Sequence, residues 1–283
     1  MTAPYQAVIL AAGRGSRIAE ETVDRPKSCL PIGPRRLGAK ETTNFLRRQC
    51  ELLRDIGVEQ IVIVVGYCKE RIYDELAEWG PYVQTVVNPT PDIKTSGSLH
   101  SFQFAAYSNL GILDGTRQTL LLDADIVYHR DVLGRLIDSP EESALLVCRR
   151  YEQNLEEVLV FGSPEEPRFL GKGLSGGLVC DLPCLGEATG IVKFAPADHA
   201  LARQSIDWML GDPRLDETSA RGAGFGPAKR ATEHEELTQR FMHYRRIRAV
   251  VFGDEIPFME VDTPEEYALL RETVYPRILE MEG

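Results

Sequence analysis

Three features are scarce in this sequence: positive charge, long apolar runs and cysteine pairs. Lysine and arginine number 32 against 43 acidic residues, which gives a formal net charge of −11. Because such a surface repels a phosphate backbone, we expect no nucleic-acid partner. No apolar run approaches the roughly 20 residues of a membrane span, so we expect no membrane partner either. The 6 cysteines form no C-x-x-C motif, which favours reduced thiols and a cytoplasmic location.

In V-I-L-A-A-G-R-G-S-R at 8–17, an apolar run is followed by two glycines, Gly13 and Gly15. Glycines let the backbone turn tightly and present N–H groups to an anion. A dinucleotide fingerprint would need a third glycine where Ile18 stands, and no Walker-type spacing occurs. The run predicts either an ordinary strand-to-helix turn or a triphosphate cradle. The residues of such a cradle are Leu10, Ala11, Ala12, Gly13, Gly15, Ser16 and Arg17.

Positive charge gathers around this run, against the balance of the whole chain. Residues 14–36 contain 6 basic and 3 acidic side chains. Arg17 and Lys27 are among the basic ones. This local reversal favours a small polyanion as the ligand.

The two motifs L-A-A-G-x-G-S-R and R-P-K-S, the second at 25–28, together resemble the signature of the nucleotidyltransferase family that couples a nucleoside triphosphate to a phosphorylated small molecule. The resemblance implies that the glycine loop wraps the triphosphate. It also implies that Lys27 reaches the phosphates at the reacting centre, with Arg17 neutralising charge beside it.

The chain as a whole shows an α/β rhythm. Buried strands are expected at 6–12, 60–65 and 82–87, helices at 40–56 and 69–79, and an irregular loop at 13–34. This order indicates an α/β domain with a mainly parallel sheet. With the resemblance, we expect a Rossmann-like three-layer α/β/α fold with a mainly parallel mixed sheet, in one domain over 1–283. Its parts are a nucleotide-binding part (1–149), an acceptor-binding part (150–246) with a flexible loop at 211–231, and a return strand, metal ligand and C-terminal helix (247–283).

Polar residues follow the third expected strand, where open α/β sheets place ligands. Thr95, Ser96 and Ser98 either cap the helix that begins at 98 or bind a nucleobase. The resemblance favours the nucleobase, and Tyr67 at the end of the second strand is expected beside it. The histidine that follows, His100, is expected to be structural.

Two carboxylates end the apolar run at 119–127, and charge there would be stranded in the core unless it opened to a site. Asp123 and Asp125 are two apart, so on an extended strand they point to one side. Such a pair can hold Mg²⁺, although one of them could cap the next helix. The resemblance makes Asp125 the metal ligand and catalytic residue, with Asp123 supporting the nucleotide. It also makes Asp262, in E-V-D-T-P-E-E-Y at 260–267, the second metal ligand rather than a helix cap.

The acceptor side is expected between 150 and 246. Lys172 and Glu187 lie in its polar stretches, and 178–180 reads as a short strand. Lys193 is either a surface lysine or a ligand for the acceptor's anionic group. Glu235 either stabilises a helix start through the helix dipole or faces a cationic acceptor.

The motifs at 8–28, 95–102, 119–127 and 260–267 resemble the phosphocholine and phosphonate cytidylyltransferase branch of the family more than the sugar-1-phosphate branch. The resemblance implies Mg²⁺-dependent transfer of CMP from CTP to a phosphocholine-like or alkylphosphonate acceptor, with release of pyrophosphate. Too few aromatic residues are at hand for a clear choline cage. The alternatives are a sugar-1-phosphate nucleotidyltransferase using another triphosphate, and a non-catalytic nucleotide-binding regulatory homologue. Members of the family often pair, so we expect a homodimer.

Overall fold

A computed structural model describes residues 4–89, 96–140, 142–151, 157–211 and 232–283. Its centre is a nine-stranded sheet, ordered β10-β9-β11-β6-β1-β4-β5, in which β8 also pairs with β11 and β12 pairs with β8. Four neighbouring strands are parallel, with Ile9 opposite both Ile63 and Leu122. These strands are β1 (Tyr5–Ala11), β4 (Gln60–Val65), β5 (Val83–Val87) and β6 (Gln118–Asp123).

The other side of the sheet is organised by the long strand β11 (Cys184–Phe194), which runs antiparallel to β6, β8 and β9. Its register shifts twice along these ladders, and Gly186 and Gly190 have positive φ angles of 135° and 70°. The remaining strands of this side are β8 (Ala144–Cys148), β9 (Leu159–Gly162), β10 (Pro167–Gly171) and β12 (Arg248–Phe252). The expected strand at 178–180 is wrong, because Gly176–Val179 forms the short helix α5.

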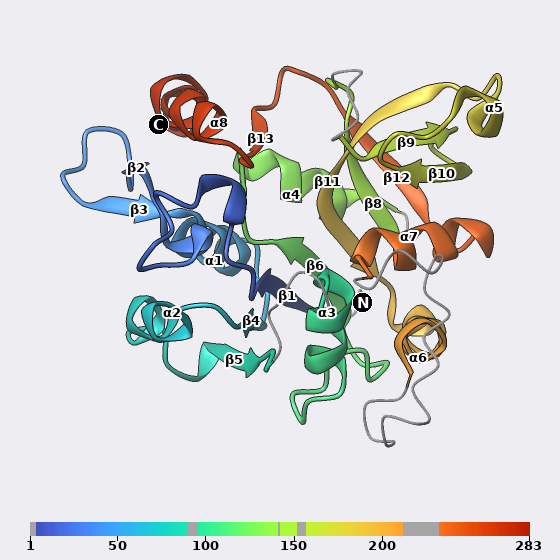
Figure 1. The fold of residues 1–283 in the computed structure, drawn as a ribbon, viewed down its shortest axis with the longest axis horizontal. Coiled ribbons are helices and arrows are strands. Elements are labelled where there is room, and N and C mark those ends of the chain that lie inside the picture. The colour runs from blue at the N-terminus through green and yellow to red at the C-terminus, as the bar shows by residue number, and fades with distance from the viewer. Residues whose placement is uncertain (1–3, 90–95, 141, 152–156, 212–231) are drawn as a thin grey trace.

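Helices cover both faces of the sheet (Figure 1). Because strand side chains alternate, Ile63 lies in the core on one face and Val64 in the core on the other. The first face packs α1 (Phe45–Asp55), α2 (Lys69–Leu76) and α4 (Arg130–Asp138). The second packs α3 (Ser98–Ala106), α6 (His199–Leu210) and α7 (His234–His243). The expected α/β/α layers and mixed sheet are therefore confirmed.

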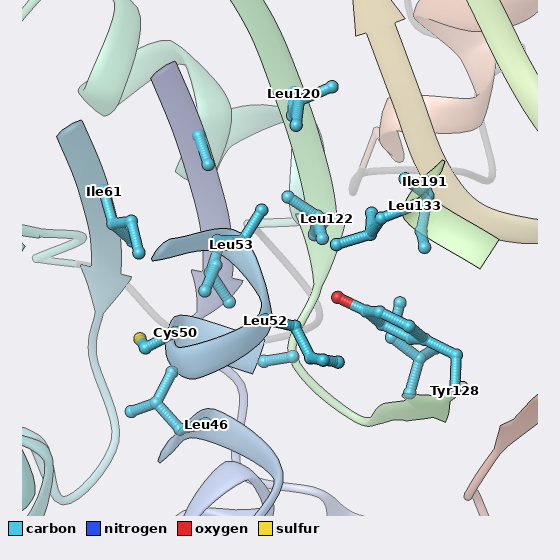
Figure 2. Packing of buried hydrophobic residues seen from close by; sticks show 14 of the residues in the cluster. Leu46, Cys50, Leu52, Leu53, Ile61, Leu120, Leu122, Tyr128, Leu133 and Ile191 are labelled. Atoms are coloured by element: carbon cyan, nitrogen blue, oxygen red, sulfur yellow. The ribbon is translucent and has the colours of Figure 1, made fainter. Parts of the chain in front are cut away.

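Helix α1 supplies much of the first face. Figure 2 shows Leu53 directed at the strands that carry Ile61, Leu120 and Leu122, and Leu52 on the side of the helix that faces Tyr128. The helix begins at an Asn44 cap, whose Oδ1 accepts from the N–H of Arg47 at 2.8 Å. Its apolar stripe therefore fixes α1 against β1, β4 and β6, and with it the polar residues on the same helix.

Two small ladders and the C-terminal helices form a third core beside the sheet. The ladder of β7 (Ile126–Tyr128) with β13 (Phe258–Glu260) joins parts of the chain that are far apart in sequence. The loop expected to be irregular at 13–34 contains the turns η1 (Ser16–Ile18) and η2 (Lys27–Cys29), and the strand β2 (Pro31–Pro34). The other elements are β3 (Thr42–Asn44), η3 (Gly80–Tyr82), η4 (Pro196–Asp198), α8 (Pro264–Leu269), the π-helical η5 (Leu270–Val274) and α9 (Tyr275–Glu282).

The expected flexible loop lies almost wholly outside the described residues, since the description stops after Gly211 and resumes at Thr232. Within the described part of the chain, no helix combines the length and apolar character that crossing a membrane requires.

Candidate active site

Lys27 lies together with three other predicted site residues. Its Nζ donates to Asp125 Oδ2 at 2.7 Å and to Asp262 Oδ1 at 2.9 Å. Arg17 donates to the other oxygen of Asp262. The structure therefore brings together Arg17, Lys27, Asp125 and Asp262, which come from three distant stretches of sequence.

The glycine loop makes room for Lys27. Gly15 has a φ of +74°, and a Cβ at this position would lie 2.9 Å from Lys27 Cβ. Both the left-handed backbone and the close approach require glycine. Thr22 Oγ1 donates to the carbonyl of Gly15 at 3.3 Å, which holds the loop from the other side.

The turn that carries Asp125 is held from α1 and from β13. Gln49 is buried, and its Nε2 donates to the carbonyls of Asp123 and Ile126 at 3.0 and 3.3 Å. The N–H of Val261 donates to the carbonyl of Asp125 at 3.1 Å. The β7–β13 ladder thus brings Asp262 to Asp125, a convergence that no spacing rule predicts.

The backbone at Asp262 is fixed by the start of α8. Thr263 and Glu266 form a capping box, in which Thr263 Oγ1 accepts from the Glu266 N–H. Glu266 Oε2 also accepts from the backbone N–H groups of Asp262 and Thr263, at 2.6 and 2.8 Å. The capping function therefore belongs to Thr263 and Glu266, and the carboxylate of Asp262 is directed to Lys27 and Arg17.

Glu260 is a third acid at this point, and the sequence analysis missed it. Asp125, Glu260 and Asp262 each offer a ligand atom within 4.8 Å of the others, and they are called the metal group below. Burial and the charge of Asp125 raise the pKa of Glu260 well above its ordinary value. The signal was available, because Glu260 and Asp262 are two apart, the same spacing that singled out Asp123 and Asp125.

The metal group and Lys27 are electrostatically linked. Burial alone would lower the pKa of Lys27, but Asp125 and Asp262 raise it above its ordinary value. Burial would likewise raise the pKa of Asp262, yet Lys27 and then Arg17 hold it below its ordinary range. Three carboxylates faced by two side-chain cations suit a hard divalent ion, since oxygen donors are the ligands that Mg²⁺ prefers. The donor set therefore fits Mg²⁺.

A cavity of about 520 Å³ opens next to the metal group. Arg17, Asp262, Lys172, Glu187 and Glu235 are all in its lining, so three of the four predicted acceptor residues face one space. Burial and then the neighbouring Glu157 raise the pKa of Glu187 to about 7, against the opposing charges of Arg150 and Lys172.

Lys193 is the exception, and both predictions for it are wrong. Its side chain is 2% exposed and its Nζ donates to the carbonyl of Leu136 at 2.9 Å, outside the cavity lining. The residue lies on β11 where that strand pairs with β6 and β8 on both sides. The alternation with apolar neighbours suggests a surface position. In the structure the side chain of Lys193 is instead buried between β11 and α4.

Asp123 belongs to a different acid group from Asp125. Strand β6 ends at Asp123, and Asp125 lies in the turn that follows, so the expected two-residue alternation does not hold. Asp123, His234 and Glu235 offer ligand atoms within 4.8 Å of one another, and they are called the second acid group below. All three line the cavity. A Cβ on Gly190 would collide with the Asp123 carboxylate, so this close approach requires glycine.

The predicted nucleotide residues surround the first strand end. Leu10 and Ala11 end β1, Ala12, Gly13 and Gly15 lead from it to Ser16 at the start of η1, and the space beyond Gly13 is open. The ring of Tyr67 lies under Arg14, and its hydroxyl donates to the carbonyls of Thr22 and Val23 at 3.0 and 2.9 Å. Tyr67 therefore holds the loop that leads to Lys27.

The polar residues before α3 and in its first turn make structural hydrogen bonds. Ser96 Oγ accepts from Asn88 Nδ2 at 2.9 Å, and Ser98 Oγ donates to Glu233 at 2.7 Å. His100 Nδ1 accepts from the Gly97 N–H at 3.2 Å, in keeping with the expected structural role. Thr95 lies outside the described residues.

Fold and site together describe a nucleoside-triphosphate transferase: a parallel strand that ends in a glycine loop, a lysine and paired acids at the sheet edge. The MobA-like NTP transferase domain matches residues 7–171, more than half of the chain, and the chain belongs to this family.

Two of the individual relatives have names that describe cytidylyl transfer. A CMP-5′-(3-aminopropyl)phosphonate synthase from Streptomyces rubellomurinus is 36% identical over 52% of this chain and 21% of its own length. A CTP:phosphoglutamine cytidylyltransferase from Campylobacter jejuni is 29% identical over 51% of this chain and 53% of its own length. The chain thus spans about half or less of these two relatives. The inositol-1-phosphate CTP transferase of T. maritima has a TM-score of 0.62 at 18% identity, covering 96% of this chain and 98% of that one, which shows a shared fold.

Proposed function

We propose that this protein is a cytidylyltransferase that transfers CMP from CTP to a small phosphonate or phosphorylated acceptor and releases pyrophosphate. One observation carries the proposal: Lys27 lies between Asp125 and Asp262, at 2.7 and 2.9 Å, and Asp262 in turn lines a cavity of about 520 Å³. The names of the relatives support CTP as the donor. The open loop beyond Gly13 is the proposed triphosphate cradle.

In the proposed reaction an acceptor phosphonate or phosphate oxygen attacks the α-phosphorus of CTP in line. The new O–P bond forms while the bond from the α-phosphorus to the α–β bridging oxygen breaks, and pyrophosphate leaves with that electron pair. The acceptor is already an anion, so no general base is needed. The obstacle is repulsion between two anions, which fixed positioning and nearby cations overcome. Lys27 and Arg17 supply those cations from the protein.

The metal group, with Asp125 and Asp262 as its predicted members, would hold Mg²⁺. When bound, the ion supplies charge neutralisation at the phosphates and a fixed geometry for them. Lys27 is paired with both of these carboxylates, so an ion held there would compete with it for them, and its Nζ would then be available to a phosphate.

A direct assay tests the proposal. The protein is incubated with Mg²⁺, each of the four ribonucleoside triphosphates in turn, and a panel of alkylphosphonates, phosphocholine and sugar 1-phosphates. We expect pyrophosphate and a CMP adduct only with CTP and a phosphonate or phospho-alcohol. A product from a sugar 1-phosphate with another triphosphate would establish the sugar-nucleotide alternative, and binding of CTP with no product under any condition would establish the regulatory one.

The cellular setting is part of the same proposal. We propose a cytoplasmic enzyme, supported by the 6 free cysteines, which suit a reducing compartment. We also propose that it pairs as a homodimer, which sedimentation of the purified chain tests directly.

A further inference from the structure

The second acid group has less positive charge around it than the other acids of the cavity. The metal group is paired with Lys27 and Arg17. Glu187 and its neighbour Glu157 are faced by Arg150 and Lys172. In the described part of the chain, the side chain in ion-pair range of both Asp123 and Glu235 is His234, and no lysine or arginine lies there.

Hydrogen bonds fix the role of His234 Nδ1. Ser98 Oγ gives its single hydrogen to Glu233 at 2.7 Å, so it can only accept from His234 Nδ1 at 3.1 Å. Nδ1 is therefore the donor of this hydrogen bond, and Nε2 is the ring atom that faces Asp123. The backbone N–H of His234 also donates to the same Ser98 oxygen at 2.8 Å, which fixes the ring at the start of α7.

The carboxylate of Asp123 receives no hydrogen bond from this ring. Nε2 of His234 lies 3.7 Å from Asp123 Oδ2, too far for a hydrogen bond, and neither atom makes a hydrogen bond to another described residue. The ring is 3% exposed, and it forms part of the cavity lining. Glu235 Oε2 is likewise buried without a hydrogen-bond partner. Such an arrangement is unfavourable unless a cationic donor enters.

We propose that Asp123, His234 and Glu235 form the subsite for a primary ammonium group on the acceptor, an inference that rests on the proposed cytidylyl transfer. A primary ammonium has three N–H donors and a positive charge, which suit two carboxylates that have no lysine or arginine of the described chain in ion-pair range. A quaternary ammonium has none and prefers a cage of aromatic rings. The described lining of the cavity contains only Tyr151 and Phe258 as aromatic residues.

The position of the second acid group suits an acceptor with a short carbon chain. Asp123 and Asp125 are two residues apart, so their Cα atoms are separated by about 7 Å at most. Both acid groups contribute side chains to one cavity, so the acceptor we propose is an aminoalkylphosphonate with a short carbon chain. The phosphonate would then lie near the cations at the metal group, and the ammonium would pair with the carboxylates of the second acid group, within one cavity.

The test compares 3-aminopropylphosphonate with propylphosphonate, which has the same chain without the amine, and with the trimethylammonium analogue. Steady-state assays give kcat/KM for each, in the wild-type protein and in Glu235→Gln. Since a hydrogen bond to a charged group is worth about 1.5–3 kcal/mol, we expect the amine preference of the wild type to fall by roughly 10- to 100-fold in the variant. Glu236→Gln, one residue along α7 and outside the cavity lining, is the matched control and should keep the preference.

Calorimetry with the Mg²⁺ complex of α,β-methylene CTP measures the same preference without turnover. A binding preference for the primary amine that is lost in Glu235→Gln would support the subsite even if no acceptor reacted. Absence of any reaction would then contradict the proposed function and not the subsite. Equal use of propylphosphonate and 3-aminopropylphosphonate, with CMP transferred to both, would overturn the subsite and leave the proposed function in place.

Three further results would overturn the subsite. One is a wild-type preference for the trimethylammonium analogue over the primary amine. Another is weaker binding of CTP alone by Glu235→Gln, which would assign the group to the ribose. The last is a second equivalent of Mn²⁺ bound by the wild type and lost in Glu235→Gln, which would assign it to a metal.

Discussion

The metal group and the second acid group both contribute carboxylates to the wall of one cavity, yet only the first is paired with lysine and arginine. Lys27 and Arg17 pair with Asp262 in the metal group, whereas in the described chain the second acid group has a histidine and no lysine or arginine in ion-pair range. Because acids with internal cations are stable without a ligand, the metal group is preformed. The second acid group is complete only when a cationic ligand enters, so we expect it to determine acceptor choice rather than the rate of bond formation.

The largest effect expected from this comparison is on turnover. Asp125→Asn removes a charged ligand worth several kcal/mol at the reacting phosphates, so kcat should fall by about a thousandfold. Asp123→Asn should instead mainly raise KM for an amine-bearing acceptor. Pyrophosphate release at saturating CTP and Mg²⁺ measures both, and circular dichroism checks the fold. Turnover within tenfold of the wild type in Asp125→Asn would remove the distinction between the groups.

The internal cation of the metal group gives the next largest effect. Lys27→Met should lower kcat by roughly a hundredfold, because one charge at the phosphates is lost. It should also lower the stability of the ligand-free protein by about 2 kcal/mol, less than for a fully buried pair, since the two carboxylates are 27% and 30% exposed.

Addition of Mg²⁺ sharpens this prediction. With Lys27 absent, the three carboxylates repel one another, so Mg²⁺ should raise the Tm of Lys27→Met more than that of the wild type. Lys172→Met is the matched control, since Lys172 lines the cavity without an ion pair to the metal group in the described chain. An equal Mg²⁺ response in all three proteins would mean that Lys27 is not the counter-ion of this group.

A smaller effect tests how the metal group is held. Gln49→Leu removes the two hydrogen bonds to the Asp123 and Ile126 carbonyls, so Mg²⁺ affinity should weaken by about 10- to 100-fold. Gln103→Leu is the matched control, because Gln103 is also buried and donates to a backbone carbonyl, that of Gly211 at 2.7 Å. Calorimetric titration with Mg²⁺ in the presence of CTP measures the difference. Equal losses in both variants would indicate general destabilisation rather than positioning.

The smallest predicted effect is the pH dependence of stability contributed by Glu187, which lines the cavity. The pKa of Glu187 is raised to about 7, so the folded protein binds more protons there than the unfolded chain between about pH 4.5 and 7. Stability from this group is therefore present at low pH and lost as the pH rises through 7. Between pH 6 and 7.5 the loss should be roughly 1 kcal/mol.

Urea unfolding of the wild type and Glu187→Gln at these two pH values checks the prediction. The glutamine variant should show a smaller decline, while the other groups that face this position, Glu157, Glu266, Arg150 and Lys172, are the same in both proteins. An identical decline in the two proteins would contradict the raised pKa.

Much of this molecule follows from local patterns in the sequence. Apolar runs at β1, β4 and β6 and the stripe on α1 specify layers, because each face must be buried against another element. The glycine at 15 and the acids at strand ends are also local signals, since backbone freedom and uncompensated charge have consequences wherever they occur.

Other features were decided only by tertiary structure. The pairing of β7 with β13 places Glu260 and Asp262 against Asp125, and a turn after β6 separates Asp123 from Asp125. Lys193 has the alternation of a surface residue but is buried beneath α4. Local patterns specify which apolar faces must be buried and which charges must be paired. Contacts between residues far apart along the chain determine which elements bury those faces and which side chains pair with those charges.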